Sequence, residues 1–310
     1  MLWVLGVLLA IVAIIVLPLL IAHRRRHPMD QAARAQATGK FADLPSGKTY
    51  YDWHGPINGP IAVCVHGLTT PSYVWRAVES GLKMMDYRVL TYDLYGRGYS
   101  DRVSGPQNAD FFITQLEELL EDQDVEGGIM LLGYSMGGAI ATFYAAKNPD
   151  MLERLILIAP AGLGVNSDRL QDFIIKTPVI GDWLMMVIGG YLLRKGIRAD
   201  SATPSAIPDI YDRQIADTYV RGFLPAVLSS MRNLLSRPLD EEHRTIASAN
   251  IPVAAIWGEA DAVIPLSGLG KLTELNRAVR QTMVADAPHS LTYTYPKDVI
   301  KAIQECLREV

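Results

Sequence analysis

The segment that decides the fold is Gly133-Tyr134-Ser135-Met136-Gly137, which is followed by Gly138. It lies between the apolar run 129–134, typical of a buried strand, and residues 136–147, whose Ala- and Gly-rich pattern indicates a helix. A serine at a sharp turn from strand to helix projects its hydroxyl at the carboxyl end of the sheet. The residues two before and two after it must lack side chains for the turn to close. We therefore predict that Ser135 is a nucleophile.

A serine hydroxyl needs a general base, and the base needs an acid that orients it. His289 stands in Ala287-Pro288-His289, directly after the last predicted strand, and is the candidate base. Asp261 follows the predicted strand 253–257 on a loop and is the candidate acid. Glu259, two residues earlier, is a rival acid, but we favour Asp261. The sequence thus predicts a catalytic triad of Ser135, His289 and Asp261.

Acyl transfer also needs fixed N–H donors for the negative oxygen that develops on the substrate. We expect one donor to be the backbone N–H of Met136, the residue after the nucleophile. The other is expected in the loop after strand 61–66, where Gly67 permits close approach and Leu68 supplies the N–H. His66 is predicted to be a structural hydrogen-bonding residue of that loop, not a base. The remaining histidines of the body, His54 and His243, are interpreted as surface residues.

The rest of the chain alternates apolar runs with helical patterns. This alternation predicts an α/β fold, with a mostly parallel sheet covered by helices on both faces. Residues 163–240 contain no convincing strand, and several prolines divide them into helical patches such as 180–193 and 218–235. We interpret them as a helical cap inserted between two core segments, 48–162 and 241–310. The predicted strands are 49–54, 61–66, 87–92, 129–134, 152–159, 253–257 and 281–285.

The amino-terminal region is strongly apolar, with no charged side chain from Leu2 to Ala22. About 20 such residues match the thickness of a bilayer core, so residues 1–22 are predicted to be a transmembrane anchor. A cleaved signal peptide is the alternative, but the basic n-region that it requires is missing. Residues 23–47 are interpreted as a juxtamembrane linker. The basic residues Arg24, Arg25 and Arg26 then predict a single-pass membrane protein with a cytoplasmic catalytic domain.

Several motifs occur together in one order and carry a resemblance to a known family. Taken together they resemble the α/β-hydrolase superfamily from about residue 50 to residue 310, and imply its fold and a serine hydrolase. The stretch Asp93-Leu94-Tyr95-Gly96-Arg97-Gly98-Tyr99-Ser100 is similar to a structural loop of that family. The anchor and small cap resemble membrane-bound monoacylglycerol lipases more loosely. The family usually has Gly directly before the catalytic His, and this chain departs from it with Ala287-Pro288-His289. The motifs are His66-Gly67, the 93–100 loop, Gly133 to Gly138, Gly258 to Pro265 and Pro288-His289.

The expected activity is cleavage of carboxylic esters through an acyl-enzyme, with monoacylglycerol or lysophospholipid-like acyl lipids as substrates. Alternatives on the same fold are a C–C bond hydrolase, a cofactor-free haloperoxidase or, with less support, a non-catalytic binding protein. Dehalogenases and epoxide hydrolases also resemble this chain, but they carry aspartate where Ser135 stands, and we therefore exclude these two activities. A net charge of −4 argues against a nucleic-acid partner. Neither of the two cysteines, Cys64 and Cys306, belongs to a CxxC motif or a Cys/His cluster, so no metal is expected, and no organic cofactor is expected either.

Overall fold

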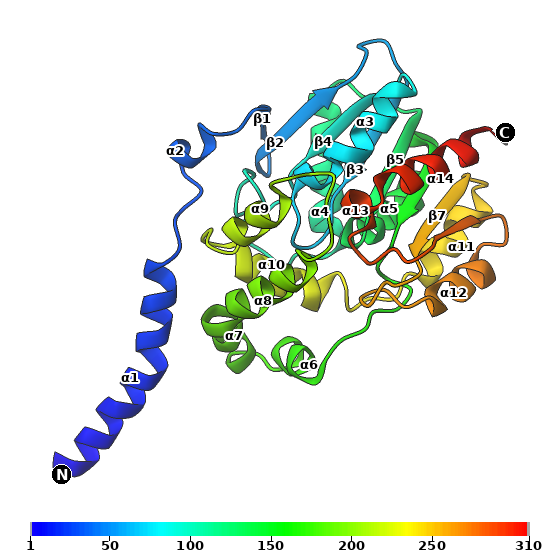
Figure 1. Ribbon diagram of the computed structural model, residues 1–310. Coiled ribbons are helices and arrows are strands. Elements are labelled where there is room, and N and C mark those ends of the chain that lie inside the picture. Colours follow the sequence, from blue (N-terminus) through cyan, green and yellow to red (C-terminus); the bar gives the residue numbers. More distant parts are fainter. Residues whose placement is uncertain (1, 309–310) are drawn as a thin grey trace.

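The computed structural model describes residues 2–308, apart from the side chains of residues 2, 7–9 and 11. Its centre is an eight-stranded sheet of order β1-β2-β4-β3-β5-β6-β7-β8 (Figure 1). Strand β2 pairs antiparallel with β1 and β4, whereas all other neighbours are parallel. The predicted α/β-hydrolase fold with a mostly parallel sheet is confirmed. The strands are β1 (Lys40–Leu44), β2 (Gly47–His54), β3 (Ile61–Val65), β4 (Arg88–Tyr92), β5 (Ile129–Tyr134), β6 (Leu152–Ile158), β7 (Val253–Gly258) and β8 (Arg280–Val284).

The central strands are apolar throughout because helices cover both of their faces. Alternate residues of β3 point to opposite sides: Val63 and Val65 belong to one buried cluster, Ala62 and Cys64 to the other. The first cluster includes residues of α4, α5, α11 and α12, and the second residues of η1, α3, α13 and α14. These elements are η1 (Ser72–Trp75), α3 (Arg76–Met84), α4 (Ala109–Asp122), α5 (Met136–Lys147), α11 (Asp240–Ser248), α12 (Ser267–Leu275), α13 (Leu291–Thr294) and α14 (Pro296–Arg308), and the short 3₁₀ turn η2 (Pro149–Met151) precedes β6.

The insertion between β6 and β7 is helical and contains no strand over residues 163–240, all of which the structure describes. The predicted helix 180–193 is interrupted by a π-helical turn, η3, that separates α7 from α8. A small core of its own holds the insertion together around Phe223, Leu224 and Val227. Its elements are α6 (Arg169–Lys176), α7 (Ile180–Leu184), η3 (Met185–Gly189), α8 (Gly190–Asp200), α9 (Ile210–Asp217) and α10 (Phe223–Asn233).

The region predicted as a linker carries an edge strand that the sequence analysis missed. Strand β1 pairs with β2 from Lys40↔Tyr51 to Leu44↔Gly47. It is preceded by the short helix α2 (Gln31–Arg34) and by a parallel bridge between His27 and Val220 of the insertion. The segment 26–44 is therefore tied both to the sheet and to the insertion.

The predicted transmembrane anchor is wrong. The first helix, α1 (Leu2–Arg24), is present, but no helix within residues 2–308 is long and apolar enough to cross a membrane. The helix contacts the insertion, where the Trp183 indole donates to the carbonyl of Ile15 at 2.9 Å. Just beyond the helix, the Arg26 guanidinium donates to the carbonyl of Met186 at 2.6 Å. The predicted single-pass membrane localisation with a cytoplasmic catalytic domain, which depended on that anchor, is corrected with it.

Candidate active site

Ser135 sits at a strained turn between β5 and α5, with φ +54° and ψ −119°. The glycines around it are required by close backbone contacts. A Cβ on Gly133 would lie 2.4 Å from the carbonyl oxygen of Gly137, and one on Gly137 would lie 2.1 Å from that of Val65. Because these obstacles are backbone atoms, the turn closes only without side chains at both positions. Strain of this kind persists where the surrounding structure enforces it and is concentrated at functional sites.

The three residues predicted as a triad are brought together from three different loops. The Oγ of Ser135 lies 2.9 Å from Nε2 of His289, and Nδ1 of His289 lies 2.8 Å from Oδ2 of Asp261. The loop of His289 is also held by Tyr134, whose hydroxyl donates to the His289 carbonyl at 2.9 Å. This is the arrangement in which an imidazole can accept a proton from a serine while a carboxylate fixes its other nitrogen.

The loop after β7 separates the roles of the two candidate acids. Oδ1 of Asp261 accepts the backbone N–H groups of Val263 and Ile264, each at 2.8 Å, which leaves Oδ2 for His289. The Asp261 side chain is only 2% exposed. Glu259 lies at the exposed surface, where it accepts the backbone N–H of Asp286 at 3.1 Å. The geometry therefore brings Asp261, and not Glu259, to the imidazole.

The loop after β3 lies against the serine. A Cβ on Gly67 would be 3.3 Å from the Cβ of Ser135, so the backbone passes close to the nucleophile. Leu68 follows it and packs against both the main core and the insertion core. Met136 is the first residue of α5 and is fully buried. The roles of the Leu68 and Met136 N–H groups as oxyanion donors stay predictions.

The other histidines of the body differ from one another. His66 is buried, its Nε2 accepts the backbone N–H of Leu94 at 2.9 Å, and burial lowers its pKa to about 3, so it is a neutral hydrogen-bonding residue as predicted. His54 is half-buried and lies 3.4 Å from both Asp52 and Glu79. The prediction that His243 is a surface residue is wrong: it is 1% exposed in α11, and burial lowers its pKa to about 4.

A buried arginine supports the loop of Leu68, and the sequence analysis gave it no role. Arg97, in the loop after β4, donates through Nε to the Leu68 carbonyl at 3.1 Å. Its other nitrogens donate to Gln107 and to Ser230 of α10. Burial lowers its pKa to about 9. Arg97 thus joins three segments that are distant in sequence, which no local pattern around residue 97 could reveal.

The rest of the 93–100 loop is structural, as the resemblance implied. The two carboxylate oxygens of Asp93 accept the backbone N–H groups of Ser72 and Tyr99, both at 2.8 Å. The hydroxyl of Ser100 donates to the Asp93 carbonyl at 2.6 Å. In the described part of the chain, no three His, Cys, Asp or Glu side chains are grouped so that they could hold a metal ion.

Comparison with known proteins places the chain in a family. Residues 60–295 match the family model described as the alpha/beta hydrolase fold, and the chain belongs to this family. The lipase LipV of Mycobacterium tuberculosis is 26% identical over 230 residues, which cover 73% of this chain and 77% of that protein. The enol-lactonase of Burkholderia xenovorans has the same fold, with a TM-score of 0.71 and 22% identity over 87% of this chain and all of that one.

An uncharacterized protein of Mycobacterium tuberculosis is also similar, at 27% identity over 225 residues and 67% of this chain. The chain matches only 64% of the length of that relative. The family match and the relative named a lipase are consistent with a hydrolase.

Proposed function

We propose that this hydrolase cleaves carboxylic esters by nucleophilic catalysis, with Ser135, His289 and Asp261 as its triad. The observation that carries the proposal is the pair of hydrogen bonds at His289, 2.9 Å to the Ser135 hydroxyl and 2.8 Å to the Asp261 carboxylate. Asp261 holds the imidazole so that its Nε2 faces the hydroxyl. A serine in this setting becomes a competent nucleophile at neutral pH.

The reaction proceeds in two halves. Ser135 Oγ attacks the ester carbonyl while His289 takes its proton, and the resulting oxyanion is stabilised by the N–H groups of Leu68 and Met136. His289 then protonates the departing alcohol, which leaves an acyl group on Ser135. In the second half His289 activates a water molecule, which releases the carboxylic acid and restores the serine.

The substrate class that we propose is a monoacyl ester, such as a monoacylglycerol or a lysophospholipid-like lipid. Leu68, at the predicted oxyanion hole, packs against the apolar core of the insertion formed around Phe223 and Leu224. An apolar wall beside the reacting carbonyl suits an acyl chain, and each buried methylene contributes about 0.8 kcal/mol. The relative named a lipase supports the same class.

Labelling with a fluorophosphonate tests the nucleophile. We expect covalent modification of the wild-type protein at Ser135, and none in Ser135→Ala or, at a useful rate, in His289→Ala. Circular dichroism of both variants checks that they are folded. Modification of folded Ser135→Ala at the same rate as the wild type would refute the proposed nucleophile.

A chain-length series tests the substrate class. We expect kcat/KM to rise from acetyl to octanoyl esters of one alcohol and to level off at palmitoyl, when further methylenes find no more apolar surface to contact. A flat or falling profile with intact Ser135 labelling would exclude acyl lipids and leave a hydrolase of small esters.

A further inference from the structure

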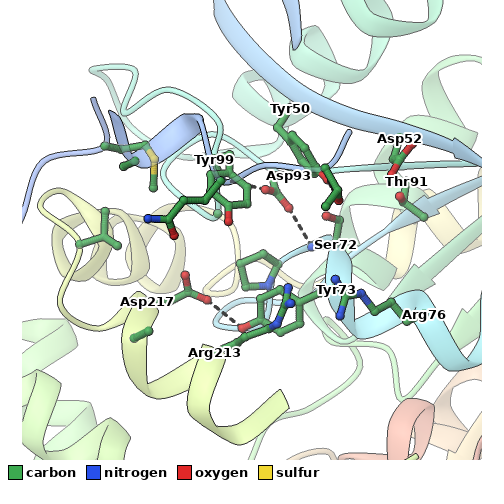
Figure 2. A pocket seen from close by; sticks show the side chains of 18 of the residues that line it. Tyr50, Asp52, Ser72, Tyr73, Arg76, Thr91, Asp93, Tyr99, Arg213 and Asp217 are labelled. Atoms are coloured by element: carbon green, nitrogen blue, oxygen red, sulfur yellow. Dashed lines mark hydrogen bonds between the residues drawn. The ribbon is translucent and has the colours of Figure 1, made fainter. Parts of the chain in front are cut away.

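A cavity between the amino-terminal segment, the sheet and α9 is lined by none of the proposed catalytic residues. It has a volume of about 780 Å³, and neither Ser135 nor His289 lines it. Its walls come from the segment before β1, from β2, from η1, from the loop after β4 and from α9 (Figure 2). A cavity of this size is within the range that holds small organic ligands.

Most charged side chains of this cavity are already satisfied by protein partners. Both oxygens of Asp93 accept backbone N–H groups. Glu79 forms an ion pair with Lys83 at 2.8 Å. Two arginines in the wall, Arg76 and Arg213, both pair with Asp209, which lies outside the cavity.

Asp217 differs from these residues. Its carboxylate accepts a hydrogen bond from the Tyr73 hydroxyl at 2.7 Å but belongs to no ion pair among residues 2–308. Figure 2 shows this carboxylate on α9 facing the open space of the cavity. Desolvation raises its pKa to about 7, and Asp93 adds to the rise, although the hydrogen bond from Tyr73 and the charges of Arg102 and Arg213 oppose it. The cavity thus presents a carboxylate whose negative charge is poorly compensated.

Aromatic rings face the same space. Tyr50 and Tyr99 meet with their ring centroids 5.3 Å apart at an angle of 55°, and Tyr73 stands below them in Figure 2. The faces of aromatic rings attract organic cations, and several rings beside a carboxylate form the usual setting for ammonium recognition. A neutral apolar ligand would supply no positive charge to the Asp217 carboxylate, and an anionic ligand would be repelled by it.

We propose that this cavity is a second ligand site, which binds a small organic ammonium ion between Asp217 and the rings of Tyr50, Tyr73 and Tyr99. A primary amine would donate hydrogen bonds to the carboxylate, whereas a quaternary ammonium would contact the rings and the charge without hydrogen bonds. The site is independent of the proposed ester hydrolysis. The loop and turn 66–73 connect the two sites, since Gly67 faces the serine and Tyr73 lines the cavity.

Calorimetric titration of the full chain at pH 8 tests the proposal, with choline as the probe. The neutral control is 3,3-dimethylbutan-1-ol, which has the shape of choline without its charge. We expect choline to bind and the alcohol not to bind. Treatment with a fluorophosphonate should leave choline binding unchanged, which separates this cavity from the active site.

Three variants assign the binding to this cavity. Asp217→Asn keeps an acceptor for the Tyr73 hydroxyl but removes the charge, and should weaken choline binding about tenfold or more. Tyr99→Leu removes one ring and should also weaken it, so it carries the test if Asp217→Asn does not fold. Asp212→Asn is the matched control on the exposed side of the same helix and should bind as the wild type does.

The proposal is overturned if choline does not bind, or if the neutral alcohol binds equally well. It is also overturned if choline binding persists unchanged in folded Asp217→Asn and Tyr99→Leu, or if the fluorophosphonate abolishes it.

Discussion

The carboxylate of Asp261 reaches the imidazole of His289 with one oxygen, at 2.8 Å from Nδ1. Its other oxygen is held by two backbone N–H groups of its own loop, so the carboxylate cannot rotate freely. The orientation of the imidazole therefore depends on the loop after β7 as well as on the charge of Asp261.

Asp261→Asn should lower kcat by up to about 10⁴-fold with little change in KM, because the imidazole loses its oriented tautomer. The corresponding Asp-to-Asn change in the triad of chymotrypsin-type serine proteases has an effect of this size. Steady-state hydrolysis of a p-nitrophenyl ester measures the effect. Glu259→Gln is the control, with near wild-type activity expected because the exposed Glu259 side chain accepts a hydrogen bond from the backbone of Asp286 and not from His289. The reverse result would make Glu259 the acid.

Gly137→Ala should prevent the turn at Ser135 from forming, because its Cβ would lie 2.1 Å from a backbone carbonyl that cannot move aside. We expect a loss of stability of about 3 kcal/mol or more, typical of severe overpacking, and loss of fluorophosphonate labelling. Gly196→Ala is the matched control, since Gly196 lies inside α8 with open space around it. That change should stabilise the protein by about 0.5–1 kcal/mol in urea denaturation. Equal effects of the two changes would refute the steric argument.

Arg97→Lys should destabilise the protein by roughly 2–4 kcal/mol, because an ammonium cannot replace the guanidinium fork and leaves buried acceptors unsatisfied. The Leu68 carbonyl is one of these acceptors, so kcat should fall as well. Denaturant unfolding and ester hydrolysis measure the two effects. The exposed Arg244→Lys in α11 is the control, with a change within about 0.5 kcal/mol. If Arg97→Lys left the free energy of unfolding unchanged, the hydrogen bonds of the buried Arg97 guanidinium would contribute little to stability.

Asp217 should make the protein less stable as the pH rises from about 4 to about 7. Its pKa is about 7 in the folded protein, above the value of 3.8 that it has when unfolded. In this interval the folded state binds more protons than the unfolded state, so the free energy of unfolding falls as the pH increases. Asp217→Asn should flatten this part of the curve of Tm against pH. A wild-type and a variant curve of the same slope would contradict the raised pKa.

The sequence predicted the parts of the molecule in which local pattern and function coincide. Buried parallel strands are apolar along their whole length, and so the runs around Cys64 and Leu131 identified β3 and β5. Ser135, Asp261 and His289 could be placed because each follows a strand whose carboxyl end lies at the same edge of the sheet. The short edge strand β1 escaped prediction, because its Lys40 and Asp43 face solvent and only part of it is buried.

Features that depend on distant contacts could not be predicted. The sequence around Asp217 does not reveal that its carboxylate accepts a hydrogen bond from the distant Tyr73 hydroxyl. His243 is buried, although its neighbours in the sequence are charged. The apolar character of residues 2–22 indicated a membrane anchor, whereas contacts such as that between Ile15 and Trp183 arise only once the insertion is in place.

The bridge between His27 and Val220 bears on the order in which the chain can fold. The guanidinium of Arg221 donates to the carbonyl of Arg26, 195 positions earlier in the chain. Synthesis proceeds from the amino terminus, so the residues around position 27 leave the ribosome long before their partners exist. Contacts over such sequence distances form slowly, because a large loop must close before they contribute any stability. We therefore expect residues 26 and 27, although made early, to dock on the insertion only after it has been synthesised, whereas β1 can pair with its neighbour β2 before that.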